Sequence, residues 1–195
     1  MLFTTAMLVD RYGGYKNPLC KIKRMADKEE IFKLKRGMYE TDGTVPGQCL
    51  AGALYGPSYL SFDYALAYYG LIPERVYEYT CATFDKKKVK LFENHFGRFS
   101  YRDIPSEAYP HEVVLKEEAG YPYAIATPEK ALCDRLYAKP PVLSQRDIQD
   151  MLFEDMRIDE EDLFKLDIGK ILILAPKYHD NNLKYLAKFL AKEAK

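Results

Sequence analysis

Residues 16–41 constrain the fold of this chain more than any other stretch, because they join a short basic helix to a basic hairpin. Asn17 is a favourable N-cap, and Pro18 fits the first helical position, where its missing N–H costs no hydrogen bond. The segment Ile31–Lys35 ends in strand-like alternation, and Arg36-Gly37 supplies a turn before the next apolar residues. These features predict the helix and the hairpin that together make the recognition parts of a winged helix.

The predicted helix over 18–28 has two different faces. At about 100° per residue, one face gathers the apolar side chains that are expected to be buried, namely Leu19, Ile22 and Ala26 with Met25 beside them. The opposite face carries three cations at Lys21, Arg24 and Lys28. A solvated helix face would show the same pattern, so the adjoining basic hairpin is what favours a role in binding phosphates.

The candidates for contacting DNA lie along the helix, its N-terminal end and the hairpin: Lys16, Asn17, Lys21, Arg24, Lys28, Lys33, Lys35 and Arg36. We expect Lys21 and Arg24 to meet DNA from the helix, and Lys35 and Arg36 to hold the backbone from the hairpin tip. Arg24 is the better reader of a guanine, because its planar guanidinium can donate two hydrogen bonds to one base edge.

The charge distribution supports a basic head on a larger body. The whole chain has a formal charge of zero, yet residues 1–45 hold nine lysines or arginines against six acids. The segment 42–47 is rich in turn formers and predicts a domain boundary. We therefore divide the chain into a winged-helix head over 1–45 and a body over 46–195. The head opens with a predicted helix within 2–13 that starts near Thr4 or Thr5 and stops at Gly13-Gly14.

The body is predicted to be an α+β domain with a sheet in its middle and helices at both ends. Strand-like runs separated by turns fill the region from 76 to 126. Helix starts are expected at Ser61, at Thr127-Pro128-Glu129, at Ser144 with Asp147, and at Asp159 with Asp162.

No segment predicts export or membrane insertion, because the apolar N-terminal run is short and no run has the length to span a bilayer. The four cysteines are far apart in sequence and form no CxxC pair. We expect a cytoplasmic protein with reduced thiols and no membrane partner.

Three segments together resemble the AbiEi antitoxins of abortive-infection, type IV toxin–antitoxin systems. They read F-K-L-K-R-G-M-Y-E over 32–40, G-P-S-Y-L-S-F-D-Y-A-L-A-Y-Y-G-L-I-P-E over 56–74, and A-T-P-E-K-A-L-C-D-R-L-Y over 126–137. The resemblance extends over roughly residues 4–190.

The resemblance implies an N-terminal winged helix-turn-helix that binds double-stranded operator DNA and represses its own operon. It also implies a C-terminal antitoxin domain that counteracts a nucleotidyltransferase-like toxin without forming a stable complex. By the same resemblance, the DNA-facing positions are Lys21, Arg24 and the tip Lys35-Arg36-Gly37. A winged helix normally has three helices and this head offers two, so the head is either minimal or completed by a helix of the body.

The other basic clusters are weaker candidates for function. Lys184, Lys188 and Lys192 recur every four residues on the last predicted helix, as the wet side of an amphipathic helix does. They are a candidate secondary surface if the body handles RNA or the toxin's nucleotide substrate. Lys86-Lys87-Lys88 with Lys90 is expected to decorate a solvent-exposed turn and a strand edge.

No catalytic residues, metal site or cofactor are predicted. The three histidines are isolated, and no HExxH, P-loop or nucleotidyltransferase signature occurs. We therefore expect a protein that is not an enzyme. Two alternatives remain open from the sequence: a nucleic-acid-processing enzyme with an unrecognised site, and a repressor whose body senses a ligand.

Overall fold

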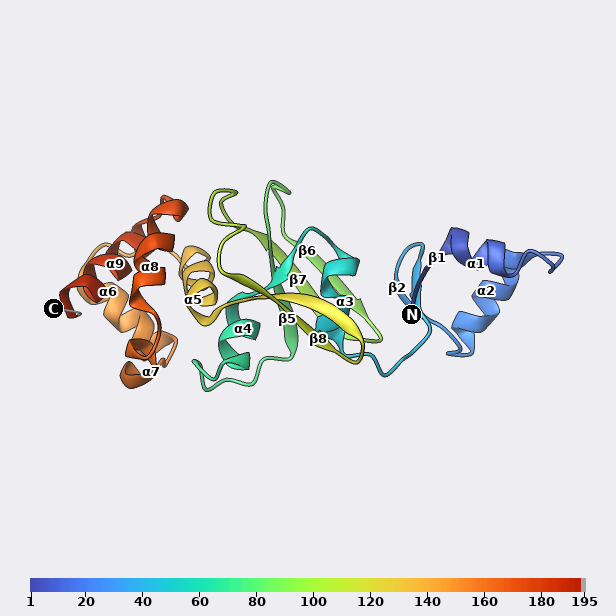
Figure 1. Cartoon of the computed structure of the whole chain (residues 1–195), viewed down its shortest axis with the longest axis horizontal. Coiled ribbons are helices and arrows are strands. Elements are labelled where there is room, and N and C mark those ends of the chain that lie inside the picture. Colours follow the sequence, from blue (N-terminus) through green and yellow to red (C-terminus); the bar gives the residue numbers. More distant parts are fainter. Residues whose placement is uncertain (194–195) are drawn as a thin grey trace.

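The computed structural model describes residues 1–193, which form an elongated molecule (Figure 1). The head lies at one end, a six-stranded sheet lies in the middle, and the C-terminal helices lie at the other end. This arrangement confirms the predicted α+β class and the order of sheet and helices within the body.

The head is built from three short strands and two helices: β1 (Leu2–Thr4), α1 (Thr5–Arg11), α2 (Pro18–Asp27), β2 (Phe32–Lys35) and β3 (Met38–Glu40). The strands form one antiparallel sheet in the order β1-β3-β2. The predicted hairpin is confirmed, and Gly37 in its turn has a φ of 82°, a value that favours glycine.

The predicted helix start near Thr4 or Thr5 is confirmed, but residues 2–4, which were grouped with this helix, form a strand. Leu2 pairs with Glu40 and Thr4 with Met38, so the first residues form a strand that closes the sheet. The helix begins only after Thr4, whose hydroxyl oxygen accepts a hydrogen bond from the N–H of Met7 at 3.2 Å. A pairing partner more than thirty residues away in sequence thus overrides the local apolar pattern.

The central sheet has the order β6-β7-β5-β4-β9-β8, with the pairs β5/β7 and β4/β9 parallel and the others antiparallel. Its strands are β4 (Tyr59–Leu60), β5 (Glu78–Thr83), β6 (Lys90–Asn94), β7 (Gly97–Asp103), β8 (Val113–Glu118) and β9 (Tyr121–Ala126). Helix α3 (Gly47–Leu54) packs on the sheet, where the Tyr101 hydroxyl donates to the carbonyl of Ala51 at 2.7 Å. Helix α4 (Phe62–Tyr68) packs against β5 and α5.

The C-terminal part consists of α5 (Pro128–Tyr137), α6 (Gln145–Asp150), a π-helical turn (Met151–Asp155), α7 (Glu160–Phe164), α8 (Ile168–Leu174), a 3-10 turn (Ala175–Tyr178) and α9 (Asn181–Glu193). The predicted caps at Thr127 and Ser144 are confirmed, the second as a complete capping box with Asp147. Asp159 caps α7 as expected, but through the N–H of Glu161 and without a capping box.

The head and the body are in direct contact across the connection 42–46. Leu34 of the head and Val45 of the connection belong to the main hydrophobic cluster. The side chain of Asn94 donates to the carbonyl of Leu34 at 3.1 Å, and the ring of His95 lies 4.2 Å from that of Phe32. The predicted boundary is therefore a packed joint between the two parts.

Candidate nucleic-acid interface

Helix α2 is fixed in the head by its cap and by its apolar face. The Asn17 side-chain oxygen accepts from the N–H of Cys20 at 3.1 Å, and Pro18 occupies the first helical position, as predicted. Ile22 and Met25 are buried with Leu8 and Ile31, a group that we call the head cluster. The opposite side of the helix is consequently held toward solvent.

The prediction that Leu19 is buried is wrong. Its side chain is 60 % exposed, whereas Met25, predicted to lie on the flank, is in the head cluster. The apolar face of α2 is therefore centred between Ile22 and Met25, closer to the C-terminal end of the helix. In the first turn of α2, Leu19 and Cys20 are exposed, whereas Pro18 is half-buried.

The cationic side chains of α2 differ in their exposure to solvent. Arg24 and Lys28 are exposed, but Lys21 is half-buried, with its ammonium 5.7 Å from the centre of the Tyr15 ring. Lys23, which was not among the predicted DNA contacts, is also exposed. Lys23 is two residues from Lys21 and was therefore placed outside the predicted cationic face. Because the buried face of α2 is formed by Ile22 and Met25, the side chain of Lys23 is accessible to solvent. Lys16 and Asn17 are exposed where α2 begins.

The hairpin offers Lys33 and Arg36, which are both exposed, but Lys35 is not available as predicted. The Lys35 ammonium donates to the carbonyl oxygens of Ala53 and Leu54 at 3.2 and 2.6 Å. These carbonyls lie at the C-terminal end of α3, where a cation is favoured by the helix dipole and by the unpaired backbone acceptors. Lys35 therefore joins the hairpin to the body instead of pointing at a ligand.

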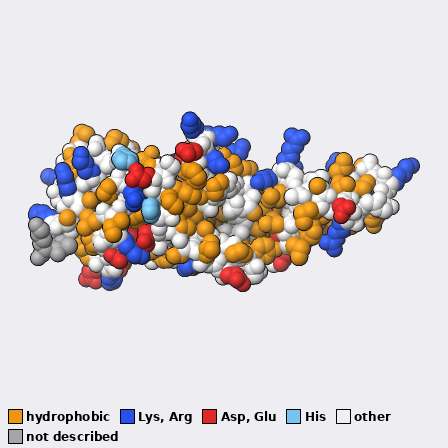
Figure 2. All heavy atoms as spheres, turned by 45° about the horizontal axis from the view of Figure 1, so that its top comes forward, with side chains coloured by type: hydrophobic (Ala, Val, Ile, Leu, Met, Phe, Trp, Pro, Cys, Tyr) orange, Lys and Arg blue, Asp and Glu red, His pale blue; other side chains and the backbone are white. Residues whose placement is uncertain are grey.

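The basic side chains of the head remain uncompensated at short range. Within residues 1–193, no ion pair involves Lys16, Lys21, Arg24, Lys28, Lys33 or Arg36. Figure 2 shows Lys and Arg side chains that project from the head into solvent. Charges arranged in this way attract the phosphates of a nucleic acid over a distance set by the salt concentration.

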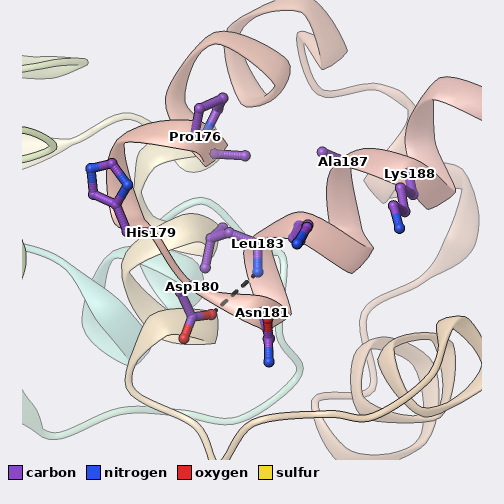
Figure 3. A pocket seen from close by; sticks show the side chains of 9 residues that line it. Pro176, His179, Asp180, Asn181, Leu183, Ala187 and Lys188 are labelled. Carbon is purple, nitrogen blue, oxygen red and sulfur yellow. Dashed lines mark hydrogen bonds between the residues drawn. The ribbon is translucent and has the colours of Figure 1, made fainter.

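The predicted secondary surface lies on α9 at the far end of the molecule. Lys184, Lys188 and Lys192 are all exposed, as expected for the wet side of this helix. Beside them is an open groove of about 570 Å³ between α9 and the residues that precede it (Figure 3). Its lining is mostly apolar, with Pro176 and Leu183 among the lining residues and Lys184 and Lys188 as its cations.

The polar groups of this groove are largely occupied. The Asp180 carboxylate accepts from the backbone N–H groups of Asn182 and Leu183, which caps α9. The His179 ring donates to Glu107 at 2.9 Å, and this hydrogen bond lowers the pKa of the Glu107 carboxyl. The groove thus lacks a converging set of free polar side chains.

A fully buried polar cluster joins the two body segments that carry the family resemblance. Its members are Tyr59, Ser61, Lys130, Asp134 and Tyr178, which we call the buried polar cluster. Asp134 accepts from the hydroxyls of Tyr59, Ser61 and Tyr178 at 3.0, 2.6 and 2.6 Å. Ser61 precedes α4, but its hydroxyl makes no cap there, so the predicted N-cap is replaced by this contact.

Lys130 completes the cluster. Its ammonium lies 3.2 Å from Asp134 and donates to the carbonyl of Ala108 and the hydroxyl of Tyr178 at 2.6 and 2.7 Å. Burial lowers the pKa of Lys130, and the Asp134 charge opposes that shift. Burial and the same charge raise the pKa of Tyr59 and Tyr178 well above the ordinary tyrosine value. Because none of these side chains reaches the surface, the cluster stabilises the body and offers no access to a substrate.

Neither a protein-family model nor a curated protein matches this chain. In the part of the chain that the structure describes, no three His, Cys, Asp or Glu side chains are grouped to hold a metal ion. No helix among those residues combines the length and the apolarity needed to cross a bilayer.

Proposed function

We propose that this protein is a DNA-binding regulator whose head acts as a winged helix on double-stranded operator DNA. The observation that carries the proposal is the set of exposed, unpaired cations on α2 and on the β2–β3 turn, both fixed on one small module. In this reading α1 and α2 form the helix-turn-helix, α2 enters the major groove, and the hairpin is the wing. The strand order β1-β3-β2 supports this assignment of helices and wing, because it places the hairpin beside β1, the strand that leads into α1.

The body is proposed to act as the antitoxin domain that the sequence resemblance implies. The two resembling segments, 56–74 and 126–137, are far apart in sequence but share the buried polar cluster. Contacts between the two segments in the core are expected if the residues that carry the resemblance maintain the fold of the domain. We propose that the body counteracts a nucleotidyltransferase-like toxin without using the buried polar cluster as a catalytic site, because the titratable groups of this cluster are closed to solvent.

The DNA-binding proposal is tested by Arg24→Ala in the full chain, with duplexes from the upstream region of its own operon and scrambled duplexes. If Arg24 reads a guanine, affinity for the operon DNA should fall by about 1–3 kcal/mol and the preference over scrambled DNA should shrink. Lys188→Ala, which removes one exposed cation at the far end of the molecule, is the matched control. A folded Arg24→Ala protein that keeps both affinity and preference would show that α2 is not the recognition helix.

The antitoxin proposal is tested by co-expression with a nucleotidyltransferase-like toxin, whose gene the proposal expects directly downstream of the gene for this chain. The variant Arg24→Ala/Arg36→Ala should still relieve growth arrest, because the proposed toxin-directed part is the body. Relief that is lost in this variant, while the protein remains folded and abundant, would contradict the division of roles. Lys184→Gln/Lys188→Gln then tests whether the α9 surface takes part, by the same growth measurement.

A further inference from the structure

The contact between Lys35 and α3 brings a basic turn of the body close to the proposed wing. The Lys35 ammonium binds the carbonyl of Leu54, and the next residue, Tyr55, carries a ring whose centre lies 5.5 Å from the ammonium of Lys86. Lys86 belongs to the connection between β5 and β6. The end of α3 therefore lies between the two basic segments, with the hairpin on one side and the β5–β6 connection on the other.

The first strand of the hairpin, β2, is also in contact with β6, the strand that follows the β5–β6 connection. The Asn94 side chain of β6 donates to the carbonyl of Leu34 in β2 at 3.1 Å. In Figure 1 the β2–β3 turn and the β5–β6 connection project from the same, upper side of the molecule. The turn that carries Arg36 therefore projects on the same side as the β5–β6 connection that carries Lys86, Lys87 and Lys88.

The β5–β6 connection is held in place by Asp103. Its carboxylate accepts from the Thr83 hydroxyl at 2.6 Å and from the backbone N–H of Lys87 at 2.5 Å. The exposed lysines of this segment are Lys87, Lys88 and Lys90, and none of them forms an ion pair within the described residues. We call Lys86, Lys87, Lys88 and Lys90 the junction lysines.

We propose that the junction lysines are a second DNA-backbone contact, which continues the phosphate-binding surface of the wing onto the body. A ligand that spans both segments must present regularly spaced negative charge along a stiff rod, which is the chemistry of a DNA duplex. The duplex beyond the site read by α2 would then lie along the joint of head and body. This inference rests on the proposed DNA-binding function and extends it to a part of the chain outside the head.

The test compares two double variants of the full chain. Lys87→Gln/Lys88→Gln removes two junction charges, and Lys184→Gln/Lys188→Gln removes two equally exposed charges from α9. Binding to operon and scrambled duplexes of equal length is measured over a salt series. The junction variant should lose up to about two units of the salt slope, about 0.9 per lost phosphate contact, and should weaken on both duplexes alike. The α9 variant should match the wild type.

A second measurement shortens the operon duplex from the flank that lies beside the wing. The wild type should lose affinity when the phosphates under the junction lysines are removed, whereas the junction variant, which keeps only Lys86 and Lys90 of the four, should lose less. An unchanged salt slope in the junction variant overturns the inference, and so does an equal loss in the α9 variant, which would reveal only the effect of net charge. If Arg24→Ala and Arg36→Ala weaken binding while the junction variant does not, the proposed function stands and this inference falls. A wild type that binds no duplex overturns both.

Discussion

The ion pair of Lys130 and Asp134 shows that a charged residue can be buried only when an opposite charge and hydrogen bonds compensate it. Both side chains have no exposed surface, and moving either charge out of water alone would cost several kcal/mol. The pair is tolerated because three hydroxyls donate to Asp134 and a backbone carbonyl accepts from Lys130. The sequence showed Lys130 and Asp134 one turn apart in a helix, but it could not show that both are buried. Their partners come from distant segments: β4 and the residue after it, the β7–β8 connection, and the 3-10 turn.

Replacing Asp134 by asparagine should destabilise the folded protein by about 3–5 kcal/mol, because Lys130 loses the charge that compensates it. Burial already lowers the pKa of Lys130, and the substitution should lower it further. The folded variant would then release this proton at a lower pH than the unfolded chain does. Its unfolding free energy should therefore rise with pH toward 10.5, the ordinary lysine value.

Urea denaturation over a pH series measures this effect. Asp150→Asn is the control, since it breaks an exposed pair with Arg146 whose N–O distance is 4.0 Å, and it should leave stability nearly unchanged. Equal stability of the Asp134→Asn variant and the wild type would mean that the buried pair is not charged.

Whole elements were predictable where their signals are local. Three signals depend only on a few neighbouring residues: the cap and proline of α2, the turn of the β2–β3 hairpin, and the start of α5 at Thr127. The strands β1 and β4 were missed because they have three and two residues, too few to show a period. What makes them strands is the pairing with β3, β5 and β9, which no local pattern records.

The cap of α2 can be separated from its proposed contact with DNA by two substitutions of Asn17. Asn17→Ala removes the acceptor for the N–H of Cys20 and should cost about 1 kcal/mol of stability. Asn17→Asp keeps an acceptor and should preserve stability, but it adds a negative charge where phosphates are proposed to approach. We therefore expect thermal unfolding to report the first change and DNA binding to report the second. Equal DNA affinity of the Asn17→Asp variant and the wild type would place the duplex away from the start of α2.

At the scale of the whole molecule, the sequence did not reveal that the segment predicted as a domain boundary packs against the body. The turn formers of 42–47 do separate β3 from α3, yet Leu34 and Val45 are buried in the main hydrophobic cluster. The misplaced residue of the candidate site, Lys35, has the same cause. Its partners, Ala53 and Leu54, belong to a helix whose position relative to the hairpin depends on the tertiary packing. A basic hairpin tip looks the same in sequence whether its lysine faces a phosphate or a helix end.

The buried polar cluster also bears on the order in which the chain folds. The Tyr59–Asp134 contact spans 75 residues of sequence and the Lys130–Tyr178 contact spans 48, so each closes a long loop of chain. Such contacts contribute no favourable free energy until the chain has lost the conformational entropy of closing those loops. They are therefore expected to form later than the local turns of α5. We therefore expect them to be among the late native contacts to form, so that their removal should raise the rate of unfolding more than it lowers the rate of folding.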